Sequence, residues 1–453
     1  MPALVSAFVC QRPPVAERRF TSGAVESLIS RVAAGIADPG LAWLFTNCLP
    51  NTLDTTVDHR IDADGRPDTY VITGDIDAMW LRDSAAQVWP CLPLARDDAA
   101  LRALLAGVIN RQARSILIDP YANAFYRDPH VTGRWHTDLT EMRPGVHERK
   151  WELDSLAYFL RLSHACWRAT GDTAPFDQTW QRAVAAILAL IRVEQSVGDA
   201  PDRSPYAFER LVGDIARSHG NRVKSRDCGL IRCSFRPSDD MVKLPFLVPA
   251  NAMMAVALRD ATALLDTLAL ADLASEARAQ AETITRALET HAVVHHPVHG
   301  EIWAYETDGY GNHHLMDDAN VPSLLSLPYL GFCGSDDPRY RRTRAFVLST
   351  DNPHYVRGTA ASGVGSPHTG PGTIWPMALT MQALTSTDDA EILACLRALK
   401  NTHAGTGFMH ESFKADDPAR FTRQWFAWAN TLFGELIVTL HNRSPHLLTD
   451  EPA

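Results

Sequence analysis

The sequence of 453 residues lacks the features that would assign it at once to several large functional classes. It has no uninterrupted apolar run of about 18 residues, so no membrane-spanning helix is predicted. Gly-x-Gly-x-x-Gly, the P-loop and Gly-x-Ser-x-Gly are missing, which argues against dinucleotide binding, a phosphate cradle and an α/β-hydrolase nucleophile. Positive charge is in deficit, and a net charge of −10 argues against nucleic acid or an anionic membrane as partner. We therefore expect a neutral partner.

Disulfide patterns are also scarce. The eight cysteines include no Cys-x-x-Cys pair, and only Cys228 and Cys233 are near enough in sequence for a local disulfide. Buried free thiols are therefore expected, which suits a reducing compartment and a cytoplasmic location. Residues 1–10 are apolar but lack a basic start and a cleavage site, so no signal peptide is predicted. A periplasmic or secreted location is the alternative, if an export signal has been removed.

Metal-ligand patterns are weak as well. His410-Glu411 lacks the second histidine of His-Glu-x-x-His, and no Cys/His cluster has zinc spacing. His313-His314 with Asp317-Asp318 is the one alternative metal site, against the simpler interpretation of a polar loop. We predict no metal and no cofactor.

What the sequence has in abundance is apolar residues at helical spacing. Helices are predicted over residues 21–36, 41–48, 97–118, 151–170, 176–194, 251–268, 272–291, 321–327, 338–350, 375–384, 388–400 and 428–440. Few strands are expected, one of them at 69–72 after the turn of residues 62–65. No linker or repeat divides the chain, so we predict a single domain over residues 1–453. A solenoid would repeat at a fixed period, so a mainly all-α fold, an (α/α) barrel with its site at one mouth, is favoured.

Residues 73–89 are predicted to begin as a turn and continue as a helix, with Asp75 and Asp77 in the positive first turn. Trp80, Arg82 and Asp83 then place an aromatic plane, a cation and a carboxylate within one turn. A solvated surface turn is the simpler interpretation of the two charges. The tryptophan favours a site that grips a polar ring, with the apolar ring face on the indole and the hydroxyls on the charged groups.

Five polar clusters interrupt the apolar helices, and each contains a carboxylate. They span residues 73–89, 147–154, 235–240, 316–320 and 409–413. Adjacent aspartates before apolar runs are often helix N-caps, and this alternative applies to both Asp pairs. Five such clusters in a chain with 11 Trp, 10 Tyr and 18 His instead favour a lined pocket. Opposed carboxylates with aromatic platforms are typical of glycoside hydrolysis, in which one acid protonates the leaving oxygen and a second carboxylate activates water or attacks the sugar.

Five motifs carry a resemblance to a known family. They are Thr73-Gly-Asp-Ile-Asp-Ala-Met-Trp-Leu-Arg-Asp-Ser-Ala, Arg236-Pro-Ser-Asp-Asp240, Met316-Asp-Asp-Ala-Asn-Val-Pro-Ser-Leu-Leu-Ser-Leu-Pro-Tyr-Leu-Gly331, Ile374-Trp-Pro-Met377, and Met409-His-Glu-Ser-Phe413 with Trp425-Phe-Ala-Trp-Ala-Asn430. In this order they resemble glycoside hydrolase family 125, from about residue 12 to residue 438. The resemblance implies an (α/α)6 barrel and an exo-acting α-1,6-mannosidase that inverts configuration without a metal. The partner it implies is a mannose-containing oligosaccharide.

The resemblance also implies roles for individual residues. Glu411 is similar to the family's general base, and the Ser-Asp-Asp segment supplies the general acid, for which Asp239 is favoured and Asp240 is the alternative. The residues implied in mannose binding are Trp80, Arg82 and Asp83, with Asp75, Asp240, Asn320, Trp375 and His410 as weaker candidates. The chain departs from the family pattern at Met241-Val-Lys-Leu244, which puts the aglycone side in doubt.

The mechanism sets two physical expectations. Burial and neighbouring Asp240 should raise the pKa of the Asp239 acid, because two carboxylates at contact distance do not ionise equally easily. Inversion requires room for water, so the carboxyl groups of Asp239 and Glu411 should lie about 6.5 to 9.5 Å apart. Two rivals stay open: an inverting glucosidase or a phosphorylase, the latter with Arg423 or His368 around phosphate, and a carbohydrate-binding scaffold in which Glu411 points away from the pocket.

Overall fold

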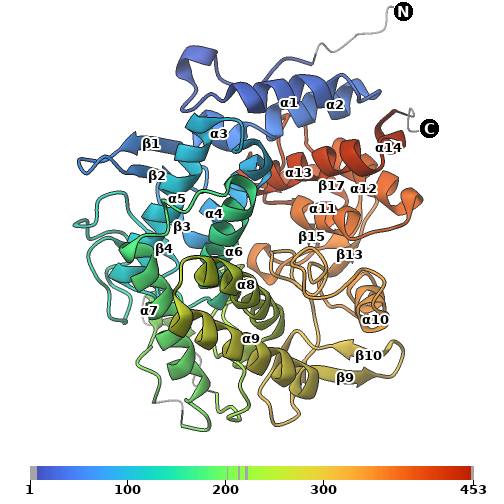
Figure 1. Ribbon diagram of the computed structural model, residues 1–453. Coiled ribbons are helices and arrows are strands. Elements are labelled where there is room, and N and C mark those ends of the chain that lie inside the picture. Colours follow the sequence, from blue (N-terminus) through green and yellow to red (C-terminus); the bar gives the residue numbers. More distant parts are fainter. Residues whose placement is uncertain (1–7, 201–202, 213–214, 220–222, 450–453) are drawn as a thin grey trace, which may run out of the picture.

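The computed structural model describes residues 8–200, 203–212, 215–219 and 223–449, so most of the predicted apolar N-terminal stretch lies outside the described residues. Helices dominate the fold (Figure 1). They are α1 (Gly23–Ala33), α2 (Pro39–Cys48), α3 (Asn51–Thr55), α4 (Leu81–Val88), α5 (Ala99–Ile118), α6 (Leu153–Thr170), α7 (Gln178–Gln195), α8 (Val248–Thr267), α9 (Ala271–His291), α10 (Pro338–Val347), α11 (Pro376–Leu384), α12 (Asp389–Asn401), α13 (Ala427–Arg443) and α14 (His446–Thr449).

Capping side chains explain where several helices begin. Ser22, Asp38, Asp98 and Asp177 each accept a hydrogen bond from a backbone N–H in the first turn of α1, α2, α5 and α7. Gly171, with a φ of 70°, ends α6 in the left-handed conformation that favours glycine. Most helices predicted from the apolar spacing are therefore confirmed, to within a few residues at each end.

The helices form a closed ring with a second layer outside it. Each of α4, α6 and α8 packs against the next, α11 packs against α13, and α13 returns to pack against α4. Outer helices α5, α7, α9, α12 and α2 lie against this inner ring and against one another, as Figure 1 shows for α8 and α9. The main cluster of buried apolar side chains extends from α1 to α14. Inner and outer helices in alternation are the arrangement of an (α/α) barrel.

One inner position holds no helix, and the helix predicted over residues 321–327 is wrong. The Asp317 carboxylate accepts hydrogen bonds from the N–H groups of Leu324 and Leu325, which gives this backbone an alternative to helical bonding. Pro322 and Pro328 also lack the N–H that a helix interior requires. Tyr158 of α6 and Tyr340 of α10 bond to carbonyl groups of this segment, so it remains packed inside the ring.

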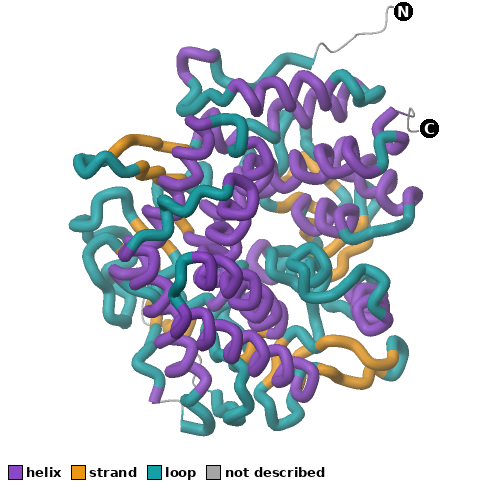
Figure 2. Tube along the Cα trace, viewed as in Figure 1, coloured by secondary structure: helices purple, strands orange, loops and turns teal. Residues whose placement is uncertain are grey.

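The strands are short and antiparallel, and they lie in the connections between helices (Figure 2). They are β1 (Val57–Ile61), β2 (Pro67–Val71), β3 (Met79–Trp80), β4 (Ala124–Phe125), β5 (Val146–Glu148), β6 (Glu209–Val212), β7 (Ile215–His219), β8 (Phe246–Leu247), β9 (Val293–His296), β10 (Gly300–Trp303), β11 (Glu306–Thr307), β12 (His313–His314), β13 (Tyr355–Arg357), β14 (Ser362–Val364), β15 (Thr373–Ile374), β16 (Ser412–Lys414) and β17 (Asp417–Thr422). The strand predicted at 69–72 is confirmed as β2.

The sheet of β3, β4 and β5 corrects the predicted start of the helix in residues 73–89. Met79 pairs with Phe125 and Trp80 with Ala124, so the chain is extended there and α4 begins only at Leu81. Asp75 and Asp77 consequently lie in the preceding turn and not in the first helical turn. The pairing fixes Trp80 directly before the helix that carries Arg82 and Asp83.

All eight cysteines are free, as predicted, and five of them are buried. Cys228 and Cys233 form no local disulfide. Within the described ranges, no helix combines the length and the apolar character needed to cross a bilayer.

Candidate active site

One cavity of about 320 Å³ collects the polar motifs of the sequence. It is lined by Thr73, Asp75, Ile76, Trp80, Arg82, Asp83, Pro237, Ser238, Asp239, Asn320, His368, Trp375, Glu411, Arg423, Phe426 and Trp428. Trp80, Trp375 and Phe426 are the residues that immediately precede inner helices α4, α11 and α13. The cavity therefore lies at the N-terminal ends of the inner helices, where helix dipoles favour negative charge.

The loop of Arg236 to Asp240 carries Asp239 into the cavity. The Asp239 N–H donates to the Arg236 carbonyl at 2.9 Å, and the Arg236 N–H donates to the Asp240 carbonyl at 2.8 Å. Asp239 has a φ of 65°, a left-handed conformation that aspartate adopts more readily than most residues. This tight turn costs backbone strain and directs the carboxylate toward Arg82, whose Nη2 lies 3.8 Å away.

A buried ion pair anchors the Asp239 loop. Arg236 Nε donates to Glu306 Oε1 at 2.7 Å, and the side chains of both residues are almost fully buried. Glu306 Oε2 also accepts from the N–H groups of Lys243 and Leu244, at 2.8 and 3.0 Å. One carboxylate thus ties both ends of the loop to β11.

Replacing Glu306 by glutamine is expected to destabilise the fold by about 3 to 5 kcal/mol, because it leaves a buried guanidinium without its counter-charge. The new amide would also turn a donor toward the N–H groups of Lys243 and Leu244. Urea unfolding measures the change. The matched control is Asp266→Asn, since Asp266 pairs with Arg278 at 3.0 Å but both side chains are about half exposed, and we expect less than about 1 kcal/mol there. Equal losses in the two variants would refute the anchoring role.

The prediction that the pKa of Asp239 is raised by burial and by Asp240 is wrong. Burial does oppose ionisation, but the charges of Lys150 and Arg82 and a hydrogen bond with Glu152 outweigh it and hold the pKa of Asp239 well below its ordinary value. Proximity in sequence was misleading, because the Asp240 side chain turns to other partners. The Asp239 side chain is therefore ionised, as a carboxylate.

Asp240 pairs with His368. Asp240 Oδ1 lies 3.6 Å from His368 Nδ1, and its Oδ2 accepts from the Ser238 hydroxyl at 3.2 Å. Burial opposes protonation of His368, but the hydrogen bond to Asp240 and the charges of Asp239, Asp240 and Glu411 raise its pKa to about 9. His368 lines the cavity whereas Asp240 does not, so the arrangement favours Asp239 over Asp240 as the acid.

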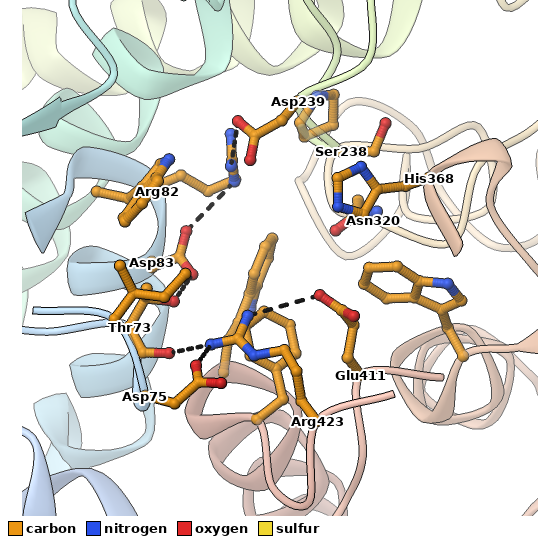
Figure 3. A pocket seen from close by; sticks show the side chains of 16 residues that line it. Thr73, Asp75, Arg82, Asp83, Ser238, Asp239, Asn320, His368, Glu411 and Arg423 are labelled. Carbon is orange, nitrogen blue, oxygen red and sulfur yellow. Dashed lines mark hydrogen bonds and ion pairs between the residues drawn. The ribbon is translucent and has the colours of Figure 1, made fainter. Parts of the chain in front are cut away.

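Glu411 enters from the other side of the cavity, as Figure 3 shows. It directly precedes β16, and its carboxylate lies 3.5 Å from Arg423 Nη1. Arg423 also donates to the Thr73 carbonyl at 2.8 Å and pairs with Asp75. Its left-handed φ of 48° is a second strained position in the cavity wall. Arg423 thus joins the turn at residues 73–75 to Glu411.

His410 is fully buried and does not line the cavity. Its ring stacks on Phe421 with centroids 3.9 Å apart, and its Nδ1 lies 3.2 Å from the Arg423 carbonyl oxygen. Of the predicted mannose-binding residues, His410 and Asp240 do not line the cavity; His410 is buried behind its wall, where it supports Arg423, and Asp240 is partly exposed.

The predicted sugar-gripping residues come together around the cavity. Trp80 lines the cavity and is buried, and its indole N–H has no hydrogen-bond acceptor among the described residues. Asp83 Oδ1 accepts from the Thr73 hydroxyl at 2.6 Å. Asn320 is held by Asp318, and Trp375 donates its indole N–H to Thr369 at 2.9 Å. Fixed polar groups beside indole faces suit a polar ring.

Sequence reasoning missed several lining residues as sugar-binding candidates. They are Thr73, Ile76, Pro237, Ser238, Phe426 and Trp428, while His368 and Arg423 were considered only as phosphate ligands. The first six lie inside the quoted motifs and Arg423 lies two residues before one, so membership of a motif or proximity to one was a signal for them. His368 has no such neighbour, and only the fold brings it to Asp239.

The alternative metal site at residues 313–318 does not form. Asp317 bonds to backbone N–H groups, and His313 Nε2 lies 3.1 Å from the His291 carbonyl oxygen. Across the described ranges, the one His and carboxylate group with suitable spacing for a metal is His296, His299 and Asp351, and it does not line the cavity.

Comparison with known proteins agrees with this geometry. The model of the metal-independent α-mannosidase family GH125 matches residues 38–438. The Meiotically up-regulated gene 157 protein of Schizosaccharomyces pombe (strain 972) is 44% identical, over 97% of this chain and 89% of that protein.

Two solved structures have a fold similar to that of this chain. A Streptococcus pneumoniae metal-independent α-mannosidase, in a non-productive complex with α-1,6-mannobiose, superposes with a TM-score of 0.87 at 39% identity, over 94% of this chain and 100% of that one. A bacterial glucoamylase complexed with acarbose has a TM-score of 0.57 at 13% identity, over 93% of this chain and 59% of that one, which supports the fold alone. The predicted (α/α)6 barrel is confirmed. The chain belongs to glycoside hydrolase family 125, the metal-independent α-mannosidases.

Proposed function

We propose that the chain is an exo-acting α-1,6-mannosidase that removes terminal mannose from the non-reducing end with inversion of configuration. The observation that carries the proposal is the pair of carboxylates, Asp239 and Glu411, on different sides of one cavity, each beside its own arginine. The cavity of about 320 Å³ lies at the small end of ligand pockets, about 300 to 1,000 Å³, which suits a chain end better than the middle of a polymer.

The proposed linkage is supported by the similar Streptococcus pneumoniae enzyme, whose non-productive complex holds α-1,6-mannobiose and whose family is connected with the processing of N-linked glycans. We extend both to this chain as its substrate class: mannose-containing oligosaccharides of the N-linked type with a terminal α-1,6 bond.

The two carboxylates divide the reaction between them. Asp239 protonates the glycosidic oxygen as its bond to C1 breaks, and Glu411 removes a proton from the water that attacks C1 from the opposite face. Arg423 holds the Glu411 carboxylate in place at 3.5 Å, and Trp80, Arg82 and Asp83 bind the mannose ring. We expect the carboxyl groups to lie about 6.5 to 9.5 Å apart in the substrate complex, which leaves room for that water.

Both rival functions fit the site less well. In a phosphorylase Arg423 would face phosphate, yet it is engaged by the Thr73 carbonyl, Asp75 and Glu411. A carbohydrate-binding scaffold would not need Glu411 in the cavity, and Glu411 lines it.

The linkage is tested by incubating the protein, with a chelator present, with α-1,6-mannobiose and separately with its α-1,2 and α-1,3 isomers. Release of mannose from the 1,6 isomer alone is the expected result, because only that linkage is expected to fit the aglycone side. Preferred cleavage of another isomer would overturn the proposed α-1,6 linkage, but the protein would still be an α-mannosidase.

We also propose a reducing compartment, the cytoplasm, as the location. Eight free cysteines, of which Cys10 is exposed, support it, since oxidising compartments favour disulfides.

A further inference from the structure

Behind Asp239 lies a buried group of charged residues, of which the mechanism above uses Arg82 and Asp83 but not Glu152, Asp154 or Lys150. Four carboxylates surround the single guanidinium of Arg82: Glu152 at 2.6 Å, Asp154 at 3.2 Å, Asp83 at 3.5 Å and Asp239 at 3.8 Å. A fifth carboxylate, Glu148, lies 3.5 Å from Lys150 and 2.8 Å from Arg210, and Arg210 is shared with a sixth, Asp138. Glu152 and Asp154 have no exposed side-chain surface. Six carboxylates around three cations leave an excess of buried negative charge, which favours a proton within the group.

Asn123 brings Glu152 and Asp239 together. Its Nδ2 lies 3.1 Å from Asp239, 3.2 Å from Glu152 and 3.3 Å from Glu148. Its orientation is fixed, because the Asn123 Oδ1 accepts from the Lys150 N–H at 3.1 Å. Glu148 also has Arg210 at 2.8 Å, so the two amide hydrogens of Asn123 are available to Asp239 and Glu152. Glu152 and Asp239 are hydrogen-bonded to each other, which needs a proton between them.

We propose that Glu152 is a positioning residue that stores the proton delivered by Asp239 and returns it to Asp239 through their shared hydrogen bond. The inference rests on the proposed roles of Asp239 and Glu411. Glu152 does not line the cavity and has no exposed surface, so it reaches the substrate only through Asp239. It lies at the residue before α6, held by Arg82 and by the Ser155 hydroxyl at 3.2 Å.

The electrostatics agree with this assignment. Burial, opposed by Arg82 and reinforced by Asp239, raises the pKa of Glu152 well above its ordinary value, while the cations beside Asp239 lower the pKa of Asp239. Glu152 is also the more deeply buried of the two, with no exposed side-chain surface against 23% for Asp239, so the shared proton is assigned to Glu152. Two carboxyl groups that share one proton titrate as a pair.

Each step balances in protons. The O–H bond of Glu152 breaks as an O–H bond forms on Asp239, and Asp239 then gives this proton to the glycosidic oxygen as the C1–O bond breaks. Glu411 accepts one proton from the attacking water. After the products leave, Glu411 releases its proton to solvent and the pair of Glu152 and Asp239 takes one up, so no co-reactant is needed.

The test is Glu152→Gln, which keeps the shape and can still donate to Asp239 but stores no transferable proton. Without the Glu152 carboxyl, Asp239 faces the positive charges of Arg82, Lys150 and His368, and is protonated only at lower pH. We therefore expect the alkaline limb of kcat/KM against pH, on α-1,6-mannobiose, to move at least one unit toward acid. On 2,4-dinitrophenyl α-mannoside, whose leaving group needs no proton, the loss at pH 7 should stay within about fivefold.

A double-mutant cycle with Asp239→Asn separates this role from a structural one. Once Asp239 is replaced, Glu152→Gln should cost less than twofold more, because both changes interrupt one proton path. Equal losses on both substrates, an unmoved alkaline limb or additive losses would each overturn the proposal. Urea unfolding confirms that each variant is folded. If the wild-type protein does not cleave α-1,6-mannobiose at all, the proposed function fails instead, so the two failures are distinct.

Discussion

Replacing Glu411 by glutamine is expected to lower kcat on α-1,6-mannobiose by about 10²- to 10⁴-fold, because the amide has the same shape but takes no proton from water. KM should change little, since Glu411 acts on the water and not on the sugar. Steady-state kinetics with mannose release measures both. The loss should be similar on 2,4-dinitrophenyl α-mannoside, because water attack is required whatever the leaving group.

The matched control is Glu435→Gln on α13. Like Glu411, Glu435 is a partly buried glutamate; the Tyr329 hydroxyl donates to it at 3.0 Å and desolvation raises its pKa to about 7, but it does not line the cavity. Its replacement should leave kcat within about threefold. A Glu411→Gln enzyme that kept more than a tenth of wild-type kcat would exclude Glu411 as the base.

Replacing Asp239 by asparagine should also lower kcat/KM on α-1,6-mannobiose by about 10²- to 10⁴-fold, because the departing sugar hydroxyl then receives no proton. The loss should shrink to less than about tenfold on 2,4-dinitrophenyl α-mannoside, which departs unprotonated. This dependence on the leaving group is specific to a general acid, and parallel measurements on the two substrates reveal it.

Asp240→Asn is the comparison that decides between the adjacent aspartates. Asp240 contacts His368 and Ser238 and lies outside the cavity lining, so its loss should be smaller and equal on both substrates. If the leaving-group dependence appears in Asp240→Asn and not in Asp239→Asn, the two roles are exchanged.

Local sequence signals predicted much of the fold. The helices α5 and α1 were predicted from apolar residues at helical spacing over residues 97–118 and 21–36. The N-capping residues, Asp98 and Ser22, lie in the same two segments as these apolar residues, so the local sequence was sufficient. The helix prediction for residues 321–327 failed because of a longer-range interaction. The Asp317 carboxylate accepts hydrogen bonds from N–H groups seven and eight residues further along the chain. The helix α4 starts later than predicted because Trp80 pairs with Ala124, and no local sequence pattern predicts that pairing.

The residues of the site were predictable where they belong to a sequence motif. Asp239, Glu411, Trp80, Arg82 and Asp83, which were named from the motifs, all line the cavity, and their roles stay predictions.

Its electrostatics were not predictable, because they depend on which distant segments meet. Lys150 and Arg82 reach Asp239 from more than eighty residues away, and their charges reverse the direction in which its pKa was expected to move. For His410 the motif itself was misleading. His410 precedes Glu411 in the motif and was predicted to bind mannose, but it lies behind the cavity wall and supports Arg423.

The most direct test of the central claim is the configuration of the first mannose released. Hydrolysis of α-1,6-mannobiose is followed by proton NMR at high enzyme concentration, so that the product anomer is read before mutarotation. Attack by a water held at Glu411, on the face opposite the proton from Asp239, predicts β-mannose as the first product. α-Mannose as the first product would mean retention, and would contradict the assignment of Glu411 as a base that activates water.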